Sequence, residues 1–176
     1  MNIPKIEFMV AKLDEIFPLM HHFLNPRNKD WDWSSAIYQS YPLLKGKLRN
    51  IKKLDKRKEI EWQFFNEVYE KEKIELKKQS EIFQMAWDKI NSDVMHALSD
   101  VVEQKWSSKD KKIVARVSLN PICPRDIKER TFDVFYMQSL EYMKSVAIHE
   151  TLHFIYFDKW KQKEMEPRTK VRERNI

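Results

Sequence analysis

The feature that most constrains the fold of this 176-residue chain is its near lack of glycine. Gly46 is the only glycine in the sequence. Because glycine supplies the positive-φ positions that β-hairpins and sandwiches need, its scarcity argues against an all-β fold and favours long helices. Hydrophobic residues make up 42% and charged residues 34%, a composition typical of globular proteins rather than disordered chains. We therefore expect a folded, helix-dominated protein.

The first half of the chain has helical periodicity. Apolar residues recur at steps of three and four over residues 3–24, which predicts an amphipathic helix with a kink or break caused by Pro18. Residues 25–47 hold two prolines and an aromatic cluster, and predict a loop with one short helix near residues 34–40. A second helical stretch is predicted over residues 55–106, as one long helix or as two shorter ones.

Two strand signals follow residue 107. β-branched and partly alternating residues over 112–119 predict one strand, and residues 131–137 predict another. The proline-containing residues 120–124 between them predict an irregular or edge segment, because proline cannot donate to a strand ladder. The chain then enters a helix at about residue 138 or 139, which continues to about residue 163.

This last predicted helix carries the sequence His149-Glu150-Thr151-Leu152-His153. Helix residues four apart lie on one face, so both imidazoles can reach a single metal ion. Imidazole nitrogens bind zinc at about 2.0–2.1 Å, and an open zinc position lowers the pKa of a bound water towards ~7. Glu150 can take a proton from that water and return it to a leaving amine. The motif therefore predicts zinc as cofactor, His149 and His153 as metal ligands, and Glu150 as the catalytic base.

Two other interpretations of this motif remain open. One is a degenerate site that keeps the shape without the chemistry, and the other is a pair of histidines satisfied by hydrogen bonds in the core. A chance H-E-x-x-H in a chain with five histidines is on the order of a one-in-a-hundred event. The match lies where helical periodicity is clearest, which favours the metal site.

The order of these parts resembles the zincin metallopeptidases, in which strands lead into an H-E-x-x-H helix. The resemblance covers residues 112–176, and its specific part is five residues long. It implies that His149 and His153 bind zinc, that Glu150 is the base, and that an upper-rim strand holds a peptide or protein substrate by β-augmentation. Either of the two predicted strands could be that rim. Within this family, the gluzincin or thermolysin-like branch adds a glutamate from a later helix as third protein ligand.

The resemblance implies that this third ligand is a carboxylate after His153. Glu173 follows His153 by twenty residues, the thermolysin-like interval, and is the preferred candidate. Glu164, Glu166 and water remain alternatives. Asp158 is five residues from His153 on the same helix and faces the motif side poorly.

The donor that would help a developing oxyanion is not assigned by the sequence. Such donors are usually Tyr, His or Arg side chains. Tyr136, Tyr142 and Tyr156 lie near the motif, and each also fits an ordinary core or rim aromatic. Cys123, the only cysteine, has no histidine close in sequence and is interpreted as a small packing residue.

Charge and hydropathy bear on partners and location. The net charge is +6, but acidic residues are interspersed with basic ones almost everywhere, which argues against nucleic acid as a partner. No window approaches the ~18 apolar residues of a transmembrane helix, so we expect no membrane partner. A single cysteine and the lack of a signal segment predict a cytoplasmic protein.

Together, these signals predict an α+β, helix-dominated fold with a small sheet before the H-E-x-x-H helix. Residues 1–106 would form a helical N-terminal region and residues 107–176 a zincin-like metal-binding region, unless both form one compact domain. The expected function is a zinc metallopeptidase acting on peptide bonds. The alternative is a catalytically degenerate or truncated zincin-like protein that serves as a helical interaction or regulatory module.

Overall fold

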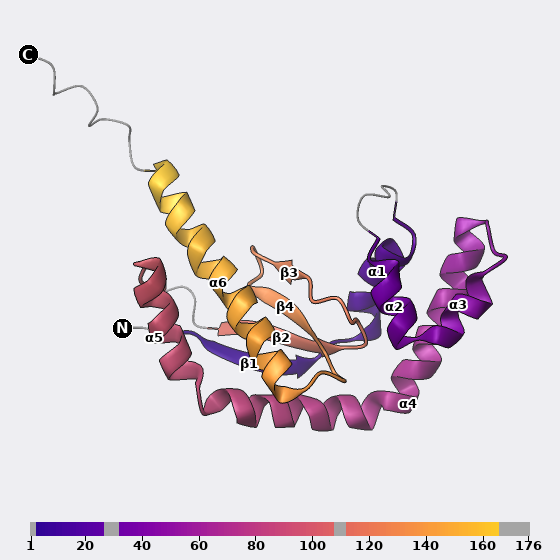
Figure 1. The fold of residues 1–176 in the computed structure, drawn as a ribbon, viewed down its shortest axis with the longest axis horizontal. Coiled ribbons are helices and arrows are strands. Elements are labelled where there is room, and N and C mark those ends of the chain that lie inside the picture. The colour runs from indigo at the N-terminus through magenta and orange to yellow at the C-terminus, as the bar shows by residue number, and fades with distance from the viewer. Residues whose placement is uncertain (1–2, 27–31, 108–111, 166–176) are drawn as a thin grey trace, which may run out of the picture.

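The computed structural model describes residues 3–26, 32–107 and 112–165, with side chains as far as residue 161 (Figure 1). It is mostly helical, with one four-stranded mixed sheet, so the predicted α+β, helix-dominated class is confirmed. In chain order the elements are β1 (Lys5–Val10), α1 (Leu13–Leu24), α2 (Ser34–Ser40), α3 (Pro42–Leu48), α4 (Leu54–Asp88), α5 (Asn91–Val102), β2 (Lys112–Ser118), β3 (Arg125–Asp126), β4 (Thr131–Phe135) and α6 (Leu140–Met165).

The sheet has the strand order β1-β2-β4-β3. β1, β2 and β4 run parallel, and the two-residue β3 is antiparallel to β4 at one edge. The two strands expected from the sequence are confirmed as β2 and β4, and both are inner strands. β2 has a neighbouring strand along both sides, so it cannot be the rim that would hold a substrate by β-augmentation. β4 is paired with β3 at Thr131 and Phe132, its first two residues. Only β1 and β3 lie at edges.

The prediction of one helix over residues 3–24 is wrong in its first part, which forms β1. Ile6 and Phe8 are buried while Glu7 between them is exposed, the period-two pattern of a strand. The same apolar residues also fit steps of three and four with those of α1, so the helical pattern concealed the alternation. The predicted break is also absent, since α1 continues through Pro18 to its end.

The helical predictions further along the chain are mostly confirmed. α2 occupies the expected residues, and the Oδ1 atom of Asp32 accepts the backbone N–H of Ser34 at 2.9 Å. The stretch 55–106 forms two helices, α4 and α5, rather than one. α3 was not predicted, because the loop signal of Pro42 and Gly46 outweighed the three leucines of this segment. The helix expected to begin near residue 139 is α6.

α4 runs along the sheet below β1 (Figure 1). Phe83 and Trp87 of this helix are fully buried, and their rings lie 6.0 Å and 6.4 Å from that of Phe8. Burying rings of this size is among the larger single contributions to a core. The core therefore includes side chains from both halves of the sequence, and it joins the sheet to α4, α6 and the other helices.

Polar side chains of α4 and α5 also cover the outer edge of β1. Gln84 accepts the backbone N–H of Phe8 at 2.8 Å and donates to the carbonyl of Ile6 at 3.1 Å. The Ser80 hydroxyl donates to the carbonyl of Phe8 at 3.0 Å, and Asn91 Oδ1 accepts the N–H of Ile6 at 3.3 Å. These side chains supply the hydrogen bonds that a neighbouring strand would otherwise make.

The regions 1–106 and 107–176 meet in this sheet, since β1 comes from the first and the other strands from the second. One cluster of buried apolar residues spans both regions. Within the described residues, none of the helices has the length and apolar character needed to cross a bilayer.

Candidate metal centre

α6 carries the H-E-x-x-H motif and is fixed to the sheet by its apolar face. Met143, Ala147 and Phe154 are fully buried, and the ring of Phe154 lies 6.5 Å from that of Phe132 on β4. Successive turns of the helix are thus anchored in the core. The opposite face of the helix, which carries His149, remains exposed.

Arg130, in the turn before β4, binds the middle of α6 through several contacts. Its Nη1 atom donates to the carbonyl of Phe154 at 3.0 Å, and its guanidinium lies 5.5 Å from the centre of the Phe154 ring. It also forms an ion pair with Asp158. Asp158 is therefore engaged away from the motif, in agreement with the expectation that it faces the motif side poorly.

The two histidines of the motif converge. Their Nε2 atoms are 3.1 Å apart, and the ring centroids are 4.7 Å apart with the rings nearly perpendicular. Two nitrogens that each lie about 2.0–2.1 Å from one zinc ion would be about 3.3 Å apart at a tetrahedral angle. The observed separation is close to this value, so His149 and His153 fit as two ligands of one ion.

The electrostatic surroundings favour the neutral form of His153, which is the form that binds metals. Its pKa is lowered, mainly by burial and further by the nearby guanidinium of Arg125 and by His149, while Glu150 acts in the opposite direction. A neutral imidazole has a free lone pair, whereas a protonated one must first lose its proton.

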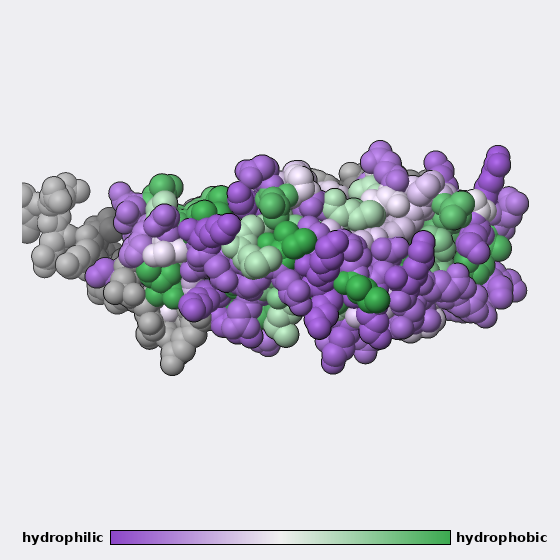
Figure 2. All heavy atoms as spheres, turned by 90° about the horizontal axis from the view of Figure 1, so that it is seen from below, coloured by the Kyte–Doolittle hydropathy of each residue, from purple (hydrophilic) through white to green (hydrophobic). Residues whose placement is uncertain are grey.

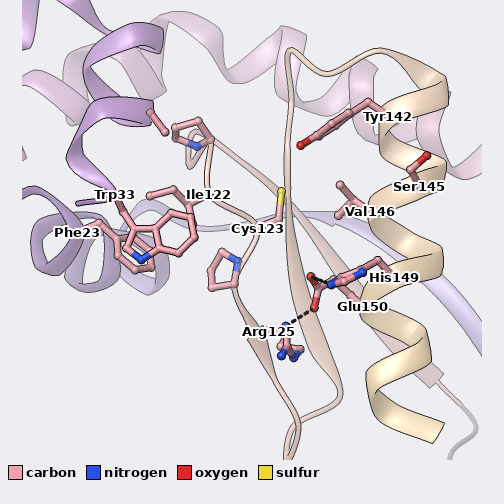
Figure 3. A pocket seen from close by; sticks show the side chains of 13 residues that line it. Phe23, Trp33, Ile122, Cys123, Arg125, Tyr142, Ser145, Val146, His149 and Glu150 are labelled. Carbon is pink, nitrogen blue, oxygen red and sulfur yellow. Dashed lines mark hydrogen bonds and ion pairs between the residues drawn. The ribbon is translucent and has the colours of Figure 1, made fainter. Parts of the chain in front are cut away.

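Glu150 lies beside the histidine pair and is almost completely buried, with 5% of its surface exposed. Its Oε2 atom accepts a hydrogen bond of 3.0 Å from Arg125 Nη1, while Oε1 lies 3.9 Å from His149 Nε2 (Figure 3). The carboxylate thus has one oxygen held by a cation and the other directed towards the first histidine. This arrangement restricts the rotation of the side chain.

A cavity of about 780 Å³ adjoins His149 and Glu150. Figure 3 shows it between α6 on one side and Phe23 and Trp33 on the other, with Ile122 between them. Most of its wall is apolar. The aromatic cluster of residues 25–47 therefore contributes Trp33 to a cavity, where 44% of its surface stays exposed.

The third metal ligand stays a prediction. Glu173 and Glu166 lie outside the described residues, and so does the side chain of Glu164. Among the described residues, no group of three or more His, Cys, Asp and Glu side chains is close enough to hold a metal ion. The structure thus brings together His149, His153 and Glu150 and leaves the remaining ligand open.

Arg125 is the site residue that sequence reasoning missed. It comes from β3, a strand too short to give a periodic signal, and its contact with Glu150 joins residues 25 positions apart. Of the three tyrosines considered as oxyanion donors, only Tyr142 lines the cavity beside the motif. Tyr136 is buried and Tyr156 lines a different hollow, between α5 and α6.

Cys123 lines the same cavity, where its thiol is shielded from solvent. Burial raises the pKa of its thiol, and hydrogen bonding from Gln138 offsets this only in part. A protonated thiol is a weak nucleophile and a weak metal ligand. This agrees with the interpretation of Cys123 as a packing residue.

The chain matches no family model, no curated protein and no solved structure. Its resemblance to the zincins therefore rests on its own residues. The chemistry is argued below from the motif, from Arg125 and from the cavity beside them.

Proposed function

We propose that this protein is a zinc-dependent metallopeptidase of zincin-like arrangement. The observation that carries the proposal is the convergence of the His149 and His153 Nε2 atoms to 3.1 Å with the Glu150 carboxylate beside them. Glu173 is the preferred third ligand, and Glu164, Glu166 or water are the alternatives. Two core histidines satisfied by protein hydrogen bonds would instead be buried, whereas the side chain of His149 is 64% exposed.

Zinc held by these histidines would polarise the substrate carbonyl and acidify a water molecule. In this mechanism Glu150 takes the proton of the attacking water and delivers it to the leaving amine nitrogen. The hydrogen bond from Arg125 Nη1 holds Oε2 of Glu150, so that Oε1 is the oxygen left to move the proton. Arg125 is thus a positioning residue, acting through the orientation of the base.

The surroundings of the motif suit an extended peptide. β3 is an edge strand that pairs with β4 on one side only, and its Arg125 reaches the base. A substrate strand added at this edge would gain backbone hydrogen bonds and bring its peptide groups near the motif. The apolar cavity beside His149 is large enough for a side chain of such a substrate.

The test is hydrolysis of an unfolded protein such as casein by the zinc-loaded chain, compared with Glu150→Gln. We expect the variant to bind zinc normally and to lose about 10²- to 10⁴-fold in rate, because the proton carrier is gone. Glu141→Gln is the matched control, since Glu141 lies on the same helix but is exposed and away from the motif. Hydrolysis retained by Glu150→Gln would contradict the mechanism.

The same experiment separates the alternative function. A native chain that binds no zinc and hydrolyses nothing would favour the catalytically degenerate zincin-like protein, acting as an interaction or regulatory module. Zinc binding without hydrolysis of several unfolded substrates would also count against the peptidase.

A further inference from the structure

The excess positive charge of the chain is concentrated in one short segment. Residues 45–58 contain eight Lys and Arg residues and one Asp, whereas the other 162 residues contain 25 basic and 26 acidic residues. The net charge of +6 therefore comes entirely from these 14 residues. The interspersed pattern noted from the sequence holds for the rest of the chain, but not here.

These residues form the end of α3, the start of α4 and the turn between them, and we call this surface the basic corner. Figure 1 shows it at the end of the molecule opposite to α5. Lys56 forms an ion pair with Glu59 at 2.9 Å. The other exposed cations of the corner have no ion pair within the described part of the chain: Lys45, Lys47, Arg49, Lys52, Lys53 and Lys58.

Arg57 makes the basic corner rigid. Its guanidinium donates to the carbonyls of Leu48 and Ile51, at 3.3 Å and 3.2 Å, and its Nε donates to Asn25 Oδ1 at 2.5 Å. These bonds hold the turn between α3 and α4 against α1. The exposed cations therefore project from an ordered, hydrogen-bonded turn.

Two leucines are exposed among these cations. Leu43 has 75% of its surface exposed and Leu54 has 55%. They lie one helical turn before Lys47 and Lys58 respectively, so each leucine shares a helix face with a lysine. Figure 2 shows hydrophobic side chains gathered within a mostly hydrophilic surface at this end of the molecule.

We propose that the basic corner binds the surface of a membrane rich in anionic lipids. Lysines and arginines near such a surface are attracted to its negative potential, and adjacent aliphatic side chains can enter the boundary of the acyl chains. A hollow of about 570 Å³ at the corner, lined by Lys45 and Arg49, could receive a lipid phosphate.

Nucleic acid fits the corner less well. Binding to single strands uses exposed aromatic rings for stacking. At the corner, Tyr41 is buried, and Tyr38, which lines the hollow, is half-buried and accepts a hydrogen bond from Arg57 at 3.3 Å. Trp62 is 39% exposed, but its ring packs edge-on against that of Phe17. Exposed leucines contribute nothing to phosphate contacts. The sequence-based expectation of no membrane partner considered only a spanning helix, so it does not bear on attachment at a membrane surface.

The test is sedimentation of the full chain with phosphatidylcholine vesicles that contain, or lack, about 30% phosphatidylglycerol. We compare the native chain with a corner variant in which Lys45, Lys47, Lys52 and Lys53 are changed to Gln. The matched control changes four exposed lysines in the middle of α4 to Gln, so that the loss of charge is the same. These control positions are Lys71, Lys73, Lys77 and Lys78.

The native chain should bind the anionic vesicles at least about tenfold more tightly than the neutral ones, and the corner variant should lose most of this preference. The control should lose less than about threefold. Equal losses in both variants, or equal binding to both kinds of vesicle, would overturn the proposal.

The leucines separate a membrane from other polyanions. Leu43→Ser combined with Leu54→Ser should weaken vesicle binding several-fold while leaving binding to a short DNA duplex unchanged. Vesicle binding that does not respond to the leucines, together with tighter binding to the duplex through the same lysines, would overturn the proposal in favour of a nucleic-acid surface. None of these measurements depends on zinc or hydrolysis.

Discussion

The two edges of the sheet are completed in different ways. Along β1, Gln84 and Ser80 occupy the backbone groups that a neighbouring strand would otherwise bind. Along β3, the described part of the chain supplies no backbone partner on the outer side, and Arg125 extends from this edge to Glu150. An unpaired edge invites association with other strands. We infer that the first edge serves stability, while the second is kept open beside the candidate site.

The Arg116–Asp133 ion pair lies between these edges, on the two inner strands, and gives the largest predicted effect. Asp133 is fully buried, and its Oδ1 atom accepts from Arg116 Nε at 2.7 Å. Burial raises the pKa of Asp133 to about 6, although Arg116 opposes this change. Because the folded pKa lies above the unfolded value of 3.8, the stability contributed by this residue is present below pH 4 and is lost as pH rises through 6.

Asp133→Asn cannot ionise, so its free energy of unfolding should rise relative to the native chain between pH 4 and pH 7. The expected difference is up to about 3 kcal/mol, measured by urea unfolding at both pH values. A constant difference across this range would show that Asp133 does not titrate in the folded protein. The buried ion pair in the centre of the sheet would then add no pH dependence to the free energy of unfolding.

Removing the cover of β1 should have the next largest effect. Gln84→Ala leaves the Phe8 N–H and the Ile6 carbonyl without their partner, which should lower the free energy of unfolding by about 1–3 kcal/mol. Gln79→Ala is the control, because Gln79 lies on the same helix and makes no hydrogen bond to β1 within the described part of the chain. Its effect should be within about 0.5 kcal/mol. An equal decrease in the free energy of unfolding in Gln84→Ala and Gln79→Ala would mean that the side chains covering β1 do not stabilise this edge.

A change at the open edge, along β3, should leave the free energy of unfolding nearly unchanged and should lower the rate of hydrolysis. Arg125→Gln should lower the kcat of hydrolysis about tenfold, or about 1.4 kcal/mol, with KM and zinc content nearly unchanged. Arg125→Lys should recover part of the rate, since it restores a donor to Glu150. Lys128→Gln, an exposed change in the following turn, is the control. A lower free energy of unfolding in Arg125→Gln with no change in kcat would mean that this edge is structural as well.

The sequence predicted the elements whose signal is local. The inner strands are rich in β-branched and aromatic residues, and α6 has clear periodicity, so both were found with nearly correct bounds. β1 was missed because six alternating residues before a helix also satisfy helical spacing. β3 has only two residues, and no local pattern can indicate a strand of that length.

For the candidate site too, the sequence predicted only the part that depends on local geometry. The pairing of His149 with His153 follows from helical geometry, and the structure brings their Nε2 atoms together. Arg125 and the wall formed by Phe23 and Trp33 come from distant parts of the chain, so their place beside the motif depends on packing. Glu173, the predicted third ligand, lies outside the described residues and stays a prediction.

The most direct test of the zinc site is the metal content of the purified protein, measured by elemental analysis after zinc reconstitution. Native protein and His96→Ala, which changes an exposed histidine of α5, should each contain about one zinc per chain. His149→Ala should contain almost none. Absence of zinc from the native protein, or equal zinc in His149→Ala, would contradict the proposal that the two converging histidines form a metal centre.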